Sequence, residues 1–463
     1  MGENRYGSNR ANHIVSNISL LFFCILYTSL FLGGAAFSET QSRTKHHHKN
    51  SKPLKKSLQG TLQSCFTPAS ILENVAVSLN PQVDSSGALS STILVRLSKQ
   101  LVSLDNKRNN IHGNDSSVVI DTILNNDKKR LWEDGLKNTV ACLVSSNWTE
   151  SQQSLEAVVE GIKGASVISR LFPKYQSPNI QPNDDIDTIC FTWWNPLVEK
   201  IIVEDERLAA ASQPHQLSAL KWAIDCFRLS TKDRDSSYQL PQSLQQAYND
   251  LDLPFTIRPG FLTKNSNHSG IPHTDEHDDE HNLFTIPSFI RQADFQTETI
   301  QTKSKRAVAE RRQTAWQGDD GVPSFEYSGK SMERMPWSAV VATVRDLLYD
   351  ETSHYYDGCL LNLYPDGGSG MRYHIDPEQG IVWDLETAVV SIGATRGFAF
   401  RSINEEGTKK SKPHSFILMD GDVTEMVRDC QDRFQHTLKT AEFKGESAPR
   451  ISLVFKKSFG NSR

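Results

Sequence analysis

The sequence predicts an α+β protein in which an all-α region of helix pairs is followed by a C-terminal β domain. Between about residues 60 and 230, apolar residues recur at the three- and four-residue spacing of amphipathic helices. From about residue 284 the chain changes to short β-branched and aromatic runs separated by Gly, Pro and Asp, such as CLLNLY at 359–364. Several short strands bounded by turn residues are typical of an all-β sandwich or barrel.

The length of 463 residues allows two or three domains. We assign residues 1–58 to a targeting segment and 59–235 to a helical-repeat-like domain. Residues 236–283 are predicted to be a linker that includes a polar loop rich in His and Asp. Residues 284–463 form the predicted β domain, and residues 337–348 within it are expected to form a helix on its outside.

The helical region has the pattern of antiparallel helix pairs. Leu94, Leu97, Leu101 and Leu104 share one face of a predicted helix, and Ser151 is a predicted helix start. The spacing between like helices is irregular and no consensus residue recurs, so a generic helical domain and an α-solenoid both stay open. The region loosely resembles the helical-repeat RNA-binding proteins of organelles, which would imply contact with RNA.

The N-terminus reads as a targeting segment. Arg5 and Arg10 precede an apolar run over residues 18–36 that ends in small residues, as in a signal peptide. Residues 41–57 are basic, contain Ser and lack acids, as in a plastid transit peptide. With Phe37 between them, these segments resemble the bipartite presequence of algae with complex plastids. That predicts a plastid protein without stable membrane association after processing; an endomembrane anchor or another organelle is the alternative.

Composition excludes some functional classes. A net charge of −5 gives no global electrostatic signature for nucleic acid, so any such site must be a local basic patch. The seven cysteines form no CxxC pair, which argues against a zinc ribbon and a disulfide framework and favours small buried thiols.

A two-His, one-carboxylate metal site is the main chemical signal. His-x-Asp occurs at His374–Asp376 and twice more in the polar loop, within residues 273–279. A rigid site needs ligands on ordered elements, so the pair that lies among predicted strands is preferred. Such a triad, with three positions left open, is typical of Fe(II) oxygenases. The residues alone leave the third ligand open between His414 and His436, with a preference for His436.

Residues 284–458 resemble the AlkB family of oxidative nucleic-acid dealkylases. That resemblance implies a double-stranded β-helix (jelly-roll) oxygenase domain, with His436 as the third ligand of Fe(II) and with 2-oxoglutarate and O2 as cosubstrates. The matching positions are Asn362-Leu-Tyr364, His374-Ile-Asp376, Ser391-Ile-Gly-Ala-Thr-Arg396-Gly-Phe398-Ala-Phe-Arg401, Gly421-Asp422, His436 and Pro449-Arg450-Ile-Ser-Leu-Val-Phe-Lys456.

The resemblance also assigns residues to 2-oxoglutarate. Asn362 and Tyr364 inherit contacts with it, and Arg450 and Lys456 inherit the binding of its carboxylates, for which Arg offers a bidentate fork. Lys456 departs from the Arg usual in the family, and it keeps the charge without the fork. Ser452 lies one pleat from Arg450 on the same strand face and could donate a hydrogen bond there.

On the substrate side, the segment around Phe325-Glu-Tyr327-Ser-Gly resembles the branch of the family that repairs alkylated bases. There Tyr327 would stack on a flipped base and Phe325 would be its pocket neighbour. Pro377 stands where that branch has an acid, so base selectivity is expected to differ. Nearby cations could contact phosphates; they are Lys303, Lys305, Arg306, Arg311 and Arg312.

Together these features predict oxidative demethylation of alkylated bases in single- or double-stranded DNA or RNA, with release of formaldehyde and succinate. Three alternatives stay open: an RNA-modification eraser guided by the helical region, a protein or lipid hydroxylase on the same fold, and a non-catalytic binding module. The lesion, the choice between DNA and RNA and the oligomeric state are not specified by the sequence.

Overall fold

The computed structural model describes residues 56–65, 67–74, 79, 84–108, 126–171, 193–231, 238–262, 283–301, 307–403 and 411–459. The chain divides into two compact units, Met1–Gly60 and Thr61–Arg463, and the second holds every element discussed below. The predicted targeting segment up to residue 55 lies outside the described residues, and so does the polar loop with its two competing His-x-Asp pairs. Among the helices that are described, none is both long and apolar enough to span a membrane.

The predicted helical region is helical in the structure. Helix α7 begins just after Ser151, whose Oγ accepts from the backbone N–H of Ser154, so the predicted N-cap is confirmed. On one side α7 packs against α4 and on the other against α10. Helices α4 and α7 approach each other closely at Gly164, where an added Cβ would lie only 2.8 Å from the carbonyl carbon of Leu94. The helices are α3 (Pro68–Asn74), α4 (Ala88–Arg108), α6 (Asn126–Ser145), α7 (Gln152–Leu171), α8 (Asn195–Val203), α9 (Asp205–Ala211), α10 (Pro214–Leu229) and α11 (Gln242–Asn249).

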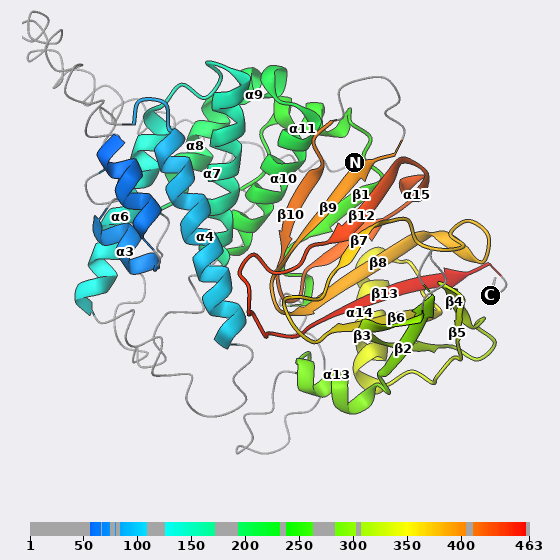
Figure 1. The fold of residues 1–463 in the computed structure, drawn as a ribbon. Helices are drawn as coiled ribbons and strands as arrows, with labels where there is room; N and C mark the ends of the chain where they lie inside the picture. Colours follow the sequence, from blue (N-terminus) through cyan, green and yellow to red (C-terminus); the bar gives the residue numbers. More distant parts are fainter. Residues whose placement is uncertain are drawn as a thin grey trace, which may run out of the picture. The chain divides into compact units, whose positions relative to one another are not determined.

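The β domain is built from two antiparallel sheets, consistent with the predicted jelly roll (Figure 1). The larger sheet has the strand order β1-β11-β8-β13-β6-β3-β2, the smaller has β10-β9-β12-β7, and β4 and β5 form a separate hairpin. The strands are β1 (Phe255–Arg258), β2 (Gln296–Gln301), β3 (Ala307–Gly318), β4 (Phe325–Tyr327), β5 (Lys330–Met332), β6 (Gly358–Tyr364), β7 (Met371–His374), β8 (Trp383–Gly393), β9 (Arg396–Ser402), β10 (His414–Leu418), β11 (Val423–Met426), β12 (Phe434–Leu438) and β13 (Arg450–Ser458).

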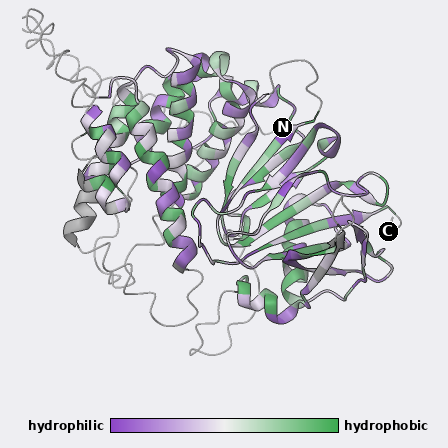
Figure 2. Cartoon of the chain, viewed as in Figure 1, coloured by the Kyte–Doolittle hydropathy of each residue, from purple (hydrophilic) through white to green (hydrophobic). Residues whose placement is uncertain are grey.

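The central strands of the larger sheet are buried on both faces. On one face, alternate apolar residues such as Leu361 and Leu453 join a core with helix α14 (Ala339–Thr352), next to α13 (Ile286–Gln292). On the other face, Asn362, Ser452 and their neighbours line a cavity. Apolar stretches therefore run along the strands of both sheets (Figure 2). The helix predicted at 337–348 is confirmed as α14, with Ser338 as its N-cap position.

The predicted linker is only partly right. Within residues 236–283 the structure has helix α11 and strand β1, and β1 pairs with β11 as the edge of the larger sheet. Four residues between prolines give too short a pattern for a strand to be predicted. Burial of Phe255 accounts for the strand, because its ring stacks on Phe400 of the smaller sheet with centroids 3.9 Å apart.

The helices pack directly on the β domain. Helix α10 lies beside β10, the edge strand of the smaller sheet (Figure 1). Trp222 meets Phe416 edge to face at 6.3 Å, and Ser218 Oγ lies 2.8 Å from His414 Nδ1. An edge strand has unpaired backbone groups, and a packed helix is one way to cover it. His414, the rival for the third metal ligand, is thus part of this contact.

His414 makes stability dependent on pH. Burial, and then the neighbouring His215, lowers the pKa of His414 from 6.5 to about 4, so the folded protein holds it neutral. The unfolded chain takes up a proton below about pH 6.5, and stability should fall from there towards pH 4 by up to about 3 kcal/mol. In urea unfolding at pH 7 and pH 5, His414→Gln should lose less stability between the two values than the wild type. An identical loss in both proteins would contradict this assignment.

Candidate metal centre and cosubstrate pocket

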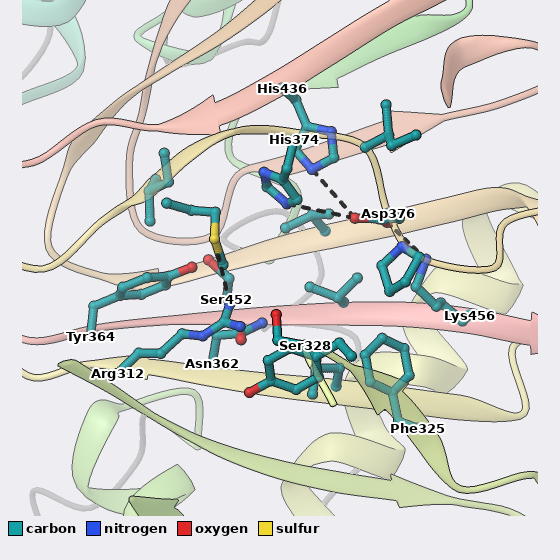
Figure 3. Close-up of a pocket in the computed structure, with 18 of the residues that line it drawn as sticks. Arg312, Phe325, Ser328, Asn362, Tyr364, His374, Asp376, His436, Ser452 and Lys456 are labelled. Atoms are coloured by element: carbon teal, nitrogen blue, oxygen red, sulfur yellow. Dashed lines mark hydrogen bonds and ion pairs between the residues drawn. The ribbon is translucent and has the colours of Figure 1, made fainter. Parts of the chain in front are cut away.

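The three predicted ligands meet where the end of β7 lies beside the middle of β12. His374 ends β7, and it lies in register with His436 on β12. Asp376 follows two residues later, just past the end of β7. The Oδ1 atom of Asp376 is 3.8 Å from Nε2 of His374 and 3.5 Å from Nε2 of His436 (Figure 3). Within the described part of the chain, this trio is the group of His, Cys, Asp or Glu residues close enough to hold a metal.

The protonation states suit a metal ion. Burial lowers the pKa of His436 to about 3, so its imidazole is neutral at physiological pH. For Asp376, burial alone would raise the pKa, but Lys456 and the two histidines outweigh it and hold the pKa well below its usual range. A neutral imidazole and an ionised carboxylate are the forms that ligate metals.

Neighbouring groups orient these side chains. Nδ1 of His374 lies 2.8 Å from the carbonyl oxygen of Arg372, which leaves Nε2 for the metal. The backbone N–H of Asp376 donates to Oε1 of Gln431 at 3.0 Å. No sequence pattern singled out Gln431, because its role depends on the packing of helix α15 (Cys430–Arg433) beside the loop after β7. His414 is not part of the trio.

The trio opens on a cavity of about 300 Å³ between the two sheets. Asn362 and Tyr364 on β6 and Ser452 on β13 line its floor, with Asn362 paired to Ser452 in register. Oδ1 of Asn362 is buried and has no hydrogen-bond partner among the described residues. A buried side-chain amide with an unpaired end can form a hydrogen bond with a polar molecule in the cavity, through its oxygen as acceptor or its NH2 group as donor.

Arg450 is fully buried and is not itself among the residues that line the cavity, but it pairs in register with Tyr364, which is. Its guanidinium donates to Oγ of Ser391 at 2.5 Å and to the carbonyl oxygen of Ala394 at 3.0 Å, while its Nε has no partner among the described residues. Burial, with Arg396 nearby, lowers its pKa to about 10, so it remains charged at neutral pH. A buried cation with a spare donor fits the carboxylate of a dianion such as 2-oxoglutarate.

Lys456, which was predicted to bind a carboxylate of 2-oxoglutarate, instead contacts the carboxylate of Asp376 in this structure. Its Nζ donates to Oδ2 of Asp376 at 2.8 Å and to Oε1 of Gln379 at 2.7 Å, with Oγ1 of Thr387 at 3.3 Å. The ammonium therefore contacts the carboxylate of a candidate metal ligand, although Lys456 also lines the cavity. The geometry suits orientation of Asp376 by a compact charge. Gln379 and Thr387 gave no sequence signal.

The β4–β5 hairpin brings the predicted substrate residues to the same cavity. Ser328 and Gly329 form its two-residue turn with φ of 49° and 74°, the left-handed values of a type I′ turn. Phe325 is buried and stacks on Trp383 with centroids 5.6 Å apart. Tyr327 lines the cavity, and its hydroxyl donates to Oε2 of Glu310 at 2.7 Å.

The two predicted cations on β3 point different ways. Arg312 lines the cavity, lies 5.0 Å from the centre of the Tyr327 ring and pairs with Glu310 at 3.2 Å. Arg311 is exposed and donates to the carbonyl oxygen of Gly368. Alternation along a strand explains the difference. Lys303, Lys305 and Arg306 lie outside the described residues.

Comparison with known proteins places the site in a family. The model of the 2OG-Fe(II) oxygenase superfamily matches residues 276–456. Uncharacterized protein R406 of Acanthamoeba polyphaga mimivirus is 33% identical over 156 residues, which are 34% of this chain and 77% of that protein. The chain belongs to the 2OG-Fe(II) oxygenase superfamily. It is therefore an Fe(II)- and 2-oxoglutarate-dependent dioxygenase that uses O2.

Two human proteins show that this oxygenase is AlkB-like. DNA oxidative demethylase ALKBH2 is 30% identical over 149 residues, which are 32% of this chain and 56% of that protein. Alpha-ketoglutarate-dependent dioxygenase alkB homolog 3 is 29% identical over 157 residues, 33% of this chain and 53% of that protein. The chain thus spans little more than half of either one. The structure of OsALKBH1 aligns with 44% of this chain and 98% of that chain at 14% identity, with a TM-score of 0.26.

The choice between His436 and His414 can be tested by metal binding. His436→Ala removes one of three ligand atoms and should weaken Mn(II) binding at least about 100-fold, since two side chains form a poor site. His414→Gln should bind Mn(II) as the wild type does, because His414 contacts Ser218 instead. Calorimetric or EPR titration under anaerobic conditions measures both. Weakened binding in the His414 variant together with unchanged binding in the His436 variant would reverse the assignment.

Proposed function

We propose that this enzyme oxidatively removes alkyl groups from alkylated bases in DNA or RNA. The supporting observation is the position of the β4–β5 hairpin: Phe325 and Ser328 lie across the cavity from His374 and Asp376 (Figure 3). An aromatic wall facing a metal centre suits a flat ring that is held while its substituent reacts. Similarity to a protein named DNA oxidative demethylase supports the same class of substrate.

The ligand trio and the buried Arg450 would bind different components of the reaction. His374, Asp376 and His436 would hold Fe(II), while Asn362, Tyr364, Ser452 and Arg450 would hold 2-oxoglutarate. When bound, iron and 2-oxoglutarate supply the oxidation of an N-alkyl carbon by O2, with succinate and CO2 as coproducts. Hydroxylation of an N-methyl carbon gives a hemiaminal, which releases formaldehyde and leaves the repaired base. The protein's part is to position the base and to exclude water, so no side chain needs to act as an acid or base.

Tyr327 is suited to hold the base because its ring is already fixed. Glu310 accepts from its hydroxyl and Lys330 donates to it at 2.9 Å. Lys330 also lies 4.8 Å from the ring centre, near the distance given above for Arg312. Fixing the ring before binding lowers the entropy lost when a base stacks on it.

Arg312 already contacts Glu310 and Tyr327, so among the described cations of β3 we assign phosphate contact to the exposed Arg311.

Two wider predictions accompany this proposal. The targeting segment is expected to direct the protein to a plastid, and the helical region could contact RNA. Helix α10 packs against the β domain through Trp222 and Ser218, so contact with RNA would use other surfaces of the helical region.

Turnover tests the proposal directly. The full-length protein with Fe(II), 2-oxoglutarate and O2 should release formaldehyde from oligonucleotides that contain N1-methyladenine or N3-methylcytosine. DNA and RNA versions, single- and double-stranded, would define the preference, and the His374→Ala variant is the control. The proposal fails if no version yields formaldehyde while the same preparation decarboxylates 2-oxoglutarate slowly without a substrate.

Removing the Tyr327 ring should affect substrate affinity more than oxidation itself. Loss of one base-stacking contact costs about 1–3 kcal/mol, so Tyr327→Ala should raise the KM for the oligonucleotide roughly 10-fold. Tyr327→Phe keeps the ring but loses the bond to Glu310, and its KM should rise less. Formaldehyde release at varied oligonucleotide concentration gives both values. Equal KM values in Tyr327→Ala and wild type would show that this ring does not hold the base.

A further inference from the structure

Among the described residues, the hydrogen-bond partners of the Arg450 guanidinium lie in one short segment that runs from the end of strand β8 into the turn to β9. Ser391 and Ala394, which accept from its guanidinium, lie at the end of β8 and in the turn to β9. The turn is tied to the start of β13 as well, because the N–H of Ala394 donates to the carbonyl oxygen of Pro449. The position of this segment therefore sets the position of the Arg450 guanidinium.

Helix α4 holds one end of the segment through Asn106. The side-chain amide of Asn106 accepts from the N–H of Thr395 at 2.8 Å and donates to the carbonyl oxygen of Thr395 at 3.2 Å. It also donates to Oε2 of Glu446 at 3.0 Å. Asn106 is 1% exposed, so these bonds form away from water. A buried side-chain amide that bonds both backbone groups of one residue fixes the backbone at that residue strongly.

Helix α7 holds the other end through Arg170. Its guanidinium donates to both carboxylate oxygens of Asp422, at 2.7 Å and 2.9 Å. The side chain of Asp422 is fully buried, and its backbone carbonyl accepts from the N–H of Ser391 at 2.9 Å. The adjacent N–H of Gly421 donates back to Ser391 at 2.8 Å. Arg170 is thus two contacts away from the hydroxyl that binds Arg450.

We propose that helices α4 and α7 position the cosubstrate clamp of the oxygenase, with Asn106 and Arg170 as positioning residues for Arg450. The inference rests on the proposed role of Arg450 in binding 2-oxoglutarate. Both side chains come from the helical region, which lies outside the residues that match the superfamily. The helical region would then contribute to cosubstrate binding, because it holds the buried guanidinium of Arg450 in the position that a carboxylate of 2-oxoglutarate requires. Displacement of such a pre-arranged group by a fraction of an ångström weakens binding markedly.

A positioning role for Asn106 and Arg170 predicts an effect on 2-oxoglutarate binding but not on metal binding. The metal ligands lie on and after β7 and on β12 of the smaller sheet, whereas the clamp residue Arg450 lies on β13 of the larger sheet. Loosening α4 or α7 should therefore weaken 2-oxoglutarate and leave the metal in place. A merely structural contact would instead lower stability and affect both ligands alike, or affect neither.

Calorimetric binding of 2-oxoglutarate to the Mn(II)-loaded full-length protein tests this. Asn106→Ala removes the neutral amide, and Arg170→Lys keeps the charge that pairs with buried Asp422 but loses the two-pronged contact. Each should raise the Kd for 2-oxoglutarate about 10-fold, the size of effect that supporting groups have on a ligand site. The Kd for Mn(II) should stay within about twofold.

Two further variants complete the design. Lys99→Ala removes a surface ion pair from α4 to Glu442 that does not lead to Arg450, and it should leave both Kd values unchanged. Arg450→Lys should weaken 2-oxoglutarate most. If Arg450→Lys has no effect, the proposed role of Arg450 is wrong. If it has an effect while Asn106→Ala and Arg170→Lys bind 2-oxoglutarate as the wild type does, or lose Mn(II) to the same extent, the positioning role is wrong and the clamp stands.

Discussion

The burial of the larger sheet on both faces is the constraint on which the rest of the structure depends. Side chains along β6 and β13 alternate between the two faces of the sheet. On one face they pack against α14, and on the other they face the space between the sheets. The second face holds charged and polar side chains such as Lys456 and Asn362 far from bulk water. A charge in that place must have a partner. Lys456 and Asp376 meet this requirement for each other, and the same pairing keeps the candidate ligand ionised.

The sequence alone was sufficient for two of the three candidate metal ligands, because their signals are local and of specific chemical types. His374 and Asp376 were chosen over two similar pairs by the strands expected around them, and the structure places them beside His436. Asp376 lies just after strand β7 rather than on it. His414 resembled His436 in type and setting. Only the three-dimensional packing shows that His414 faces helix α10 and Ser218.

Other features depend on contacts between residues far apart in the chain, which no local pattern reveals. Strand β1 was predicted to be linker because four residues between prolines carry little periodicity, whereas Phe255 is fixed by the ring of Phe400. The second contact of Lys456, with Gln379, was likewise absent from the sequence pattern. The same is true of Asn106, an ordinary polar residue near the end of a predicted helix. Its importance follows from a partner 289 residues away.

Strand β1 also bears on where the protein can be divided. The match to the superfamily begins at residue 276, whereas β1 ends at Arg258 and pairs with β11. A fragment cut at the limit of sequence similarity would leave β11 as a bare strand edge and would uncover the ring of Phe400. Exposed edges of this kind pair with other chains, so such a fragment would tend to aggregate. The limit of family resemblance is therefore not a boundary of autonomous folding in this protein.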